Sequence, residues 1–219
     1  MGTVSIMFTL ALIIGTTTAD IETRTLIDVD EKGKATSYIF NQRILTANGF
    51  TLVTKSLQPD SGDVSYSRQD FAMSGEPRKF AQEGFWNDRW NVFETVFKKD
   101  GAEQSINGEV TPSKLGAAKF KNPTLLWFWR THPKVGESVT VDFLAQNTII
   151  TFKINFAYEG DEKVTLKGRE VTLHRVREKP ISAPDAVYTI WWYDDLGMGV
   201  KRYHKTTEHE YWYQLLSWR

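Results

Sequence analysis

The last third of the chain most constrains the fold, because apolar and polar residues alternate there between turn signals. Apolar side chains recur at every second position from Ile150 to Tyr158. A period of two is the pattern of a β-strand with one buried face. Turn residues then separate further strand-like runs, which lie at 139–144, 171–176, 187–193, 200–204 and 211–218. The pattern predicts antiparallel strands joined by short turns, including a turn at Glu159-Gly160-Asp161.

The first half of the chain is also rich in strand signals. Strands are predicted at 20–29, 37–46 and 50–57, with a hairpin turn at Asn48-Gly49. The mostly polar run 64–71 predicts a strand near a sheet edge. Residues 76–89 are expected to be irregular, and 90–98 is apolar on both faces, which predicts a strand covered on both sides. Since composition does not change along the chain, we expect one β-rich domain over residues 20–219.

One segment departs from the β pattern. Pro123 suits a first helical turn, and the run Leu125–Arg130 follows it before Pro133. We expect a short helix over 123–131, packed on the concave side of the sheet. The predicted fold class is mainly β, a single curved antiparallel sheet or open barrel with this helix.

The N-terminus carries an uncharged apolar run, Val4–Gly15, followed by small residues. The run is too short to span a bilayer, which takes roughly 20 residues. It predicts a signal peptide over residues 1–19, cleaved after Ala19. A buried first strand or an uncleaved anchor is the alternative. The chain has no cysteine, which excludes disulfides, thiolate catalysis and a lipid-modified cysteine. We therefore expect an exported, soluble protein, periplasmic or secreted, with no integral membrane segment after cleavage.

Charge and aromatic content limit the functions that this chain could have. The 27 basic and 27 acidic residues balance, so no overall field recruits nucleic acid. Aromatic residues make up 13%, with eight tryptophans, which indicates an apolar pocket or patch. An all-β core that uses aromatic side chains as its bulk is the alternative.

The order of elements over about residues 120–205 resembles a known family. A helix-like Leu125–Arg130, Val135-Gly136-Glu137, the strand 139–144, Glu159–Val164, Gly168, the strand 171–176 and Tyr188–Arg202 follow in series. This series is similar to a family of exported bacterial proteins of unassigned function. The resemblance implies a strongly curved antiparallel sheet, related in shape to the LolA/LolB-type lipoprotein carriers, and a scaffold for an apolar ligand. It implies no catalytic residues.

Groups that could perform chemistry are few. His204, Glu208 and His209 flank a predicted hairpin tip, but no further ligand accompanies them, so we expect no metal there. Asp194-Asp195 is interpreted as a turn, although paired carboxylates can also act as acid and base. Nucleotide-binding and serine-hydrolase motifs are absent from the sequence. We predict no catalytic residue and no cofactor.

The aromatic residues give the candidate ligand site. Tyr188, Ile190 and Trp192 are predicted to leave one face of their strand and to pack inward against the apolar residues at 150–156, with Trp191 the more exposed indole. The candidate ligand-binding residues are Trp127, Trp129, Phe152, Phe156, Tyr188 and Trp192. The leading hypothesis is binding or carriage of an apolar or amphipathic ligand in the concavity of the sheet. A structural or protein-docking envelope protein is the alternative, and a hydrolase is a third.

Overall fold

A computed structural model describes residues 20–74, 76–99, 101–113, 132–144, 151–181, 186–195 and 199–218. These residues form one antiparallel sheet of fourteen strands. The strands are β1 (Asp20–Asp30), β2 (Ala35–Thr46), β3 (Gly49–Leu57), β4 (Val64–Ala72), β5 (Pro77–Trp86), β6 (Arg89–Lys98), β7 (Gly101–Ile106), β8 (Glu109–Ser113), β9 (Ser138–Leu144), β10 (Thr151–Leu166), β11 (Arg169–Pro180), β12 (Ala186–Tyr193), β13 (Gly199–Thr206) and β14 (Glu210–Trp218).

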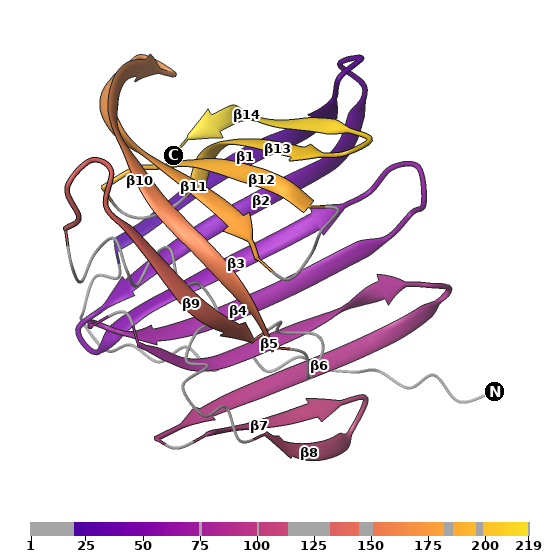
Figure 1. Ribbon diagram of the computed structural model, residues 1–219. Helices are drawn as coiled ribbons and strands as arrows, with labels where there is room; N and C mark the ends of the chain where they lie inside the picture. Colours follow the sequence, from indigo (N-terminus) through magenta and orange to yellow (C-terminus); the bar gives the residue numbers. More distant parts are fainter. Residues whose placement is uncertain are drawn as a thin grey trace.

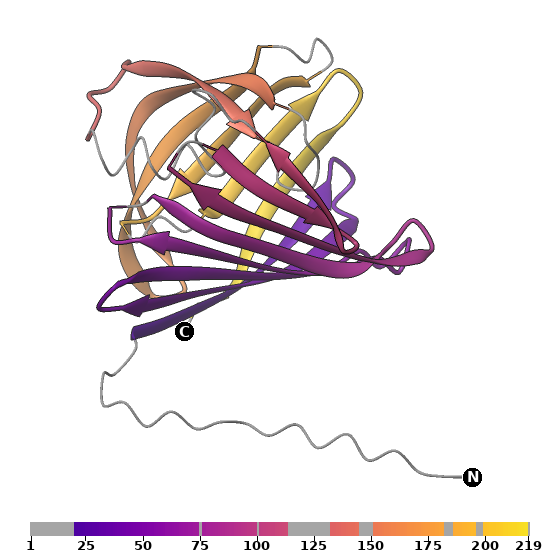
Figure 2. The same cartoon turned by 90° about the horizontal axis from the view of Figure 1, so that it is seen from below.

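The order of strands joins the two ends of the chain in the middle of the sheet. It runs β8-β7-β6-β5-β4-β3-β2-β1-β14-β13-β12-β11-β10-β9, so β1 pairs with β14, while β8 and β9 are the edges. The sheet is open and coils on itself, so that β9 and β10 cross in front of its strands down to β5 in Figure 1. Figure 2 shows the coiled sheet from below. No helix within the described ranges is long and apolar enough to cross a membrane.

Two ion pairs identify the concave face. Arg24 on β1 contacts Asp194 at the end of β12, although β14 and β13 lie between these strands. Asp28 on β1 pairs with Arg202 on β13 at 3.2 Å, across β14. In a flat sheet, strands two or three positions apart are about 10–14 Å from each other. The sheet therefore curls toward the face that carries these four side chains.

The buried core continues along the concave face. Cross-strand partners share a face, and the register Arg24–Asn41–Thr54–Ser67–Gln82 carries the concave face from β1 to β5. Phe80 lies on the same face as Gln82. It pairs with Thr95 of β6, which pairs in turn with Gln104 of β7, and all three side chains are buried. Polar and apolar side chains of the described residues thus line the concavity together.

Most predicted strands are confirmed, and the single curved antiparallel sheet is confirmed with them. The hairpin between β2 and β3 is also confirmed, although its two turn residues are Ala47 and Asn48. Gly49 already pairs with Ala72 of β4, at a point where a Cβ would stand 2.0 Å from the Phe71 carbonyl oxygen. The predicted helix over 123–131 lies outside the described residues, as does the predicted signal peptide.

Three predictions in the first half are wrong. The polar strand β4 lies inside the sheet rather than near an edge, because its polar side chains pair across strands, as in Ser56–Ser65 at 2.7 Å. Residues 76–89 are mainly strand β5, since Gly84 lets β4 approach closely instead of ending the strand. The strand β6 is not covered on both faces, because Val92 is 43% exposed.

The predicted turn at Glu159-Gly160-Asp161 is also wrong. β10 runs through it for 16 residues, with a register shift between Tyr158 and Gly160. Gly160 adopts φ +118°, which a residue with a side chain rarely adopts. The extra residue forms a bulge, and a bulge reverses which side chains face the core. This bulge divides β10 into two halves that serve opposite faces of the sheet.

Candidate functional site

Two apolar clusters lie on opposite faces of β10–β13. The first contains Ile154, Phe156, Tyr158 and Val176, with Tyr193 packed against it. The second contains Leu173, Ile190, Trp192 and Val200, with Val164, Leu166, Val171, Tyr188, Tyr203 and Leu215 packed against it. The register explains the division, because Tyr158 lies opposite Val176 and Val176 lies opposite Trp191. Trp191 therefore lies on the concave face and Trp192 on the convex face. We call the second group of residues the convex cluster.

This division corrects the predicted facing. Trp192 was expected to pack against Ile154 and Phe156, but it packs in the second cluster instead. Trp192 is nevertheless the more buried indole, at 6% exposure, and Trp191 is half-buried, in the predicted order. Alternation within one strand predicts which residues share a face, whereas the pairing register decides what they meet.

The predicted ligand-binding residues whose side chains the structure describes do not share one face of the sheet. Phe156 is buried on the concave face, whereas Tyr188 and Trp192 belong to the convex cluster. Trp127 and Trp129 lie outside the described residues. Phe152 is placed by its backbone alone, opposite Phe143 of β9.

A groove borders the convex cluster. Its volume is about 340 Å³, within the range of small-molecule sites. It lies between the far half of the β10–β11 hairpin and strands β13 and β14. The hairpin curls away beyond the bulge at the top of Figure 1. Six apolar and two charged side chains line it: Val164, Leu166, Leu173, Val200, Trp212, Leu215, Glu162 and Lys201.

Trp192 links the groove to its charged side chains. Its indole N–H donates to Glu162 Oε2 at 2.7 Å. The Lys201 ammonium nitrogen lies 4.3 Å from the indole ring centroid, and Arg175 lies on the same ring at 5.5 Å. A cation over an aromatic face is attracted by the ring quadrupole, most strongly for Trp. The groove therefore has an apolar lining with a carboxylate and an ammonium group held beside it.

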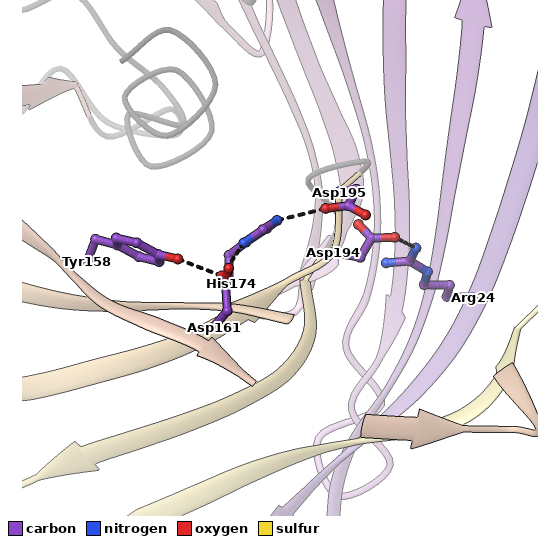
Figure 3. Close-up of polar contacts among 6 residues, drawn as sticks. All are labelled: Arg24, Tyr158, Asp161, His174, Asp194 and Asp195. Atoms are coloured by element: carbon purple, nitrogen blue, oxygen red, sulfur yellow. Dashed lines mark hydrogen bonds and ion pairs between the residues drawn. The ribbon is translucent and has the colours of Figure 1, made fainter. Parts of the chain in front are cut away.

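The concave side carries a network of titratable groups (Figure 3). His174 on β11 bonds Asp161 through Nδ1 at 2.6 Å and Asp195 through Nε2 at 2.9 Å. Tyr158 donates to the same Asp161 oxygen at 2.5 Å. Burial alone would raise the pKa of Asp161, but the hydrogen bonds from Tyr158 and His174 outweigh it and hold that pKa below its usual value. Burial, with the bond to Asp161, raises the pKa of the Tyr158 phenol.

Beside this network, Arg24 is fully buried and pairs with Asp194 and Glu22. Asp194 is thus an ion-pair partner as well as part of a predicted turn, while Asp195 is exposed and holds His174. Sequence reasoning missed Arg24, whose one signal is a cation within the strand pattern of β1. It also missed the joint position of Asp161 and His174, which only the β10–β11 register brings together.

A second buried group lies further along the concave face. Asp28 accepts from Arg202 through Oδ2, while its Oδ1 has no hydrogen-bond partner among the described residues. Burial raises the pKa of Asp28 to about 6, against the opposing effect of Arg202. Trp191 donates to Glu178 Oε2 at 2.9 Å, and Arg202 lies 5.3 Å from the Trp191 ring centroid. The Arg202 guanidinium therefore pairs with Asp28, and its charge also opposes the burial that raises the pKa of Glu178.

The histidines of the predicted hairpin tip are separated by their environments. His204 is half-buried and bonds the Thr189 hydroxyl at 2.6 Å, and burial lowers its pKa. His209 is exposed, and its Nε2 lies 3.9 Å from Glu208. In the parts of the chain that the structure describes, no group of three or more histidine or acidic residues is arranged to hold a metal ion.

Comparisons with known proteins bear on the fold. No family model matches the chain, and no curated protein matches its sequence. Among solved structures, a β-barrel-like protein of the domain of unknown function DUF1849 from Brucella abortus superposes with TM-score 0.62 at 10% identity, covering 91% of this chain and 96% of that one. This similarity shows a shared curved β fold.

Two lipoproteins are more distant. They are the hypothetical lipoprotein YmcC from Escherichia coli (TM-score 0.38, 13% identity, covering 89% of this chain and 86% of that one) and a putative lipoprotein from Parabacteroides distasonis (0.37, 11%, 90% and 94%).

Proposed function

We propose that this protein is an exported protein that binds a small amphipathic ligand. The observation that supports the proposal is the groove beside the convex cluster, which combines an apolar lining with Glu162 and Lys201. An apolar chain would lie against Leu173, Val200 and Leu215, and a polar head would lie beside Lys201. Concave apolar sites with a few charged groups at one end are typical of ligand-binding pockets.

The location of the site differs from the sequence-based hypothesis, which put the ligand in the concavity. On the concave face, charged side chains pair with one another, such as Arg24 with Asp194 and Asp28 with Arg202. On the convex face, Lys201 has no ion pair among the described residues and lies over the Trp192 ring. Glu162 lines the same groove but accepts from the Trp192 indole, so the Lys201 ammonium group is available to the anionic head of an amphipathic ligand.

The proposed function includes export, with removal of residues 1–19. Cleavage after Ala19 would leave β1 whole, because β1 begins at Asp20. N-terminal sequencing of the exported protein should begin at Asp20 or within a few residues of it. Recovery of Met1 on exported protein would contradict removal of the first 19 residues.

The groove is tested with one pair of matched variants. Val164 and Val171 are direct cross-strand partners in one hairpin and both pack on the convex cluster, but of the two only Val164 lines the groove. Dodecanoate binding is measured by isothermal titration calorimetry for the wild-type protein, Val164→Lys and Val171→Lys. We expect Val164→Lys to weaken binding at least tenfold, about 1.4 kcal/mol, and Val171→Lys to leave it nearly unchanged.

A second comparison tests the head group. Lys201→Met should weaken dodecanoate more than dodecanol, because only the carboxylate gains from the ammonium group. Wild-type protein that binds neither dodecanoate nor dodecanol would overturn the proposed function. Equal losses in Val164→Lys and Val171→Lys would place the ligand elsewhere.

A further inference from the structure

A row of exposed apolar side chains crosses five neighbouring strands. The register places Tyr38 opposite Leu57, Leu57 opposite Val64, Val64 opposite Phe85, and Phe85 opposite Trp90. All five side chains are 38–58% exposed. Direct cross-strand partners share a face, so these side chains form one continuous line from β2 to β6. We call them the exposed row.

The exposed row lies on the convex face. Phe85 and Gln82 are three residues apart in β5 with no register shift between them, so they leave opposite faces, and Gln82 belongs to the concave row of Arg24. In Figure 1 the strands β2–β6 lie side by side. The ligand groove is separate, because none of the five residues lines it.

The apolar area of the exposed row is too small for a stable protein interface. The row spans four strand spacings, about 19 Å. With Val92 beside it, also 43% exposed, the exposed apolar area is roughly 500 Å², taking about 200 Å² for a fully exposed large side chain. A stable dimer or complex buries about 800 Å² on each partner. A patch of this size is nevertheless among the largest that monomeric proteins expose, and such patches are often functional.

The charges around the exposed row balance. Lys34 and Asp60, in the turns beside the row, pair with each other at 2.6 Å. In the neighbouring cross-strand row, Lys55 lies over the rings of Phe40 and Tyr66, and Glu83 lies on the other side of Tyr66. The surface around the row therefore carries no excess of positive or negative charge. A partner with no net charge complements such a surface.

We propose that the exposed row inserts into the headgroup region of a zwitterionic lipid bilayer. Tyr and Trp prefer this interface, because each has an apolar ring and a polar tip. Trp90, Phe85 and Tyr38 supply aromatic anchors, and Leu57 and Val64 fill the line between them. A bilayer accepts side chains one at a time, so it does not need the area that a protein partner needs. Balanced charges make the contact independent of salt.

The experiment measures cosedimentation of the full chain with phosphatidylcholine vesicles. The row variant is Tyr38→Ser/Leu57→Ser/Trp90→Ser. The control variant is Val110→Ser/Val135→Ser/Ile181→Ser, which removes three apolar side chains that are 56–68% exposed and lie away from the row. Whatever residues 1–19 contribute to binding is common to all three proteins. Since the substituted side chains are exposed, the circular dichroism spectrum and the melting temperature should be unchanged. If the row variant fails to fold, the single variant Trp90→Ser replaces it.

We expect the row variant to lose at least about tenfold in vesicle partitioning, and the control variant to stay within about twofold of wild type. Added salt or phosphatidylglycerol should not change wild-type binding. Equal binding by the row variant, or binding that falls with salt, would overturn the proposal. Light scattering that finds a dimer dissolved by the row variant would assign the surface to a second copy instead.

Discussion

The Trp191 indole N–H donates to Glu178 Oε2 at 2.9 Å, diagonally across the β11–β12 pair. Burial raises the pKa of Glu178, and the hydrogen bond from Trp191 and the nearby Arg202 oppose that rise. The indole therefore stabilises an ionised carboxylate that its surroundings disfavour. The same tryptophan lies under the Arg202 guanidinium, which pairs with Asp28 on the other side.

Trp191→Phe tests this hydrogen bond while keeping an aromatic ring in place. We expect a loss of about 1–3 kcal/mol in the free energy of unfolding at pH 7, because a buried carboxylate loses a donor. The loss should shrink at acid pH, where Glu178 is protonated. Urea unfolding measures both values. In a Glu178→Gln background the same substitution should cost less, and an equal cost there would show that packing, not the hydrogen bond, is responsible.

Asp28→Asn tests the buried carboxylate on β1. The pKa of Asp28 is about 6 in the folded protein and 3.8 ordinarily, so the folded state holds this proton more tightly than the unfolded state. Between about pH 4 and 6 folding therefore takes up a proton, and the stability contributed by Asp28 falls as pH rises. Relative to Asp28→Asn, the wild-type protein should lose roughly 2 kcal/mol from pH 4 to pH 7. Urea unfolding at four pH values measures the difference, and a difference that rises with pH would contradict it.

Trp192→Ala tests the convex cluster. Trp192 is 6% exposed, and truncating a buried aromatic side chain costs about 3–5 kcal/mol. Trp191→Ala should lower the free energy of unfolding by less, because Trp191 is only half-buried. Thermal unfolding of the two variants measures the contrast. Equal destabilisation would contradict the assignment of Trp192 to the tighter packing environment.

Gly84→Ala tests the close approach of β4 and β5. A Cβ at Gly84 would stand 2.1 Å from the Val64 carbonyl oxygen and 2.8 Å from the Ser65 Cα. Because backbone cannot move aside cheaply, we expect a cost of about 2–4 kcal/mol. Gly62→Ala is the control, since nothing lies within 4 Å of its Cβ position and its φ of +74° costs about 1 kcal/mol. Denaturant midpoints should differ accordingly, and a smaller loss for Gly84→Ala than for Gly62→Ala would be inconsistent with the packing.

The sequence by itself determined the β class, most strand positions and the alternation within each strand. These follow from local chemistry, because the period of two and the turn residues act over a few neighbouring positions. Alternation correctly put Trp191 and Trp192 on opposite faces, and the apolar pattern correctly ranked their burial.

Only the tertiary structure decided which faces meet. The bulge between Tyr158 and Gly160 reverses the faces of β10, so Phe156 and Leu166 serve opposite sides of the sheet. Register also assembled the ligand groove, the exposed row from Tyr38 to Trp90, and the pairing of Arg24 with Asp194, 170 residues apart. Such contacts depend on pairing and curvature summed over the whole sheet, and a shift of one residue would exchange every face.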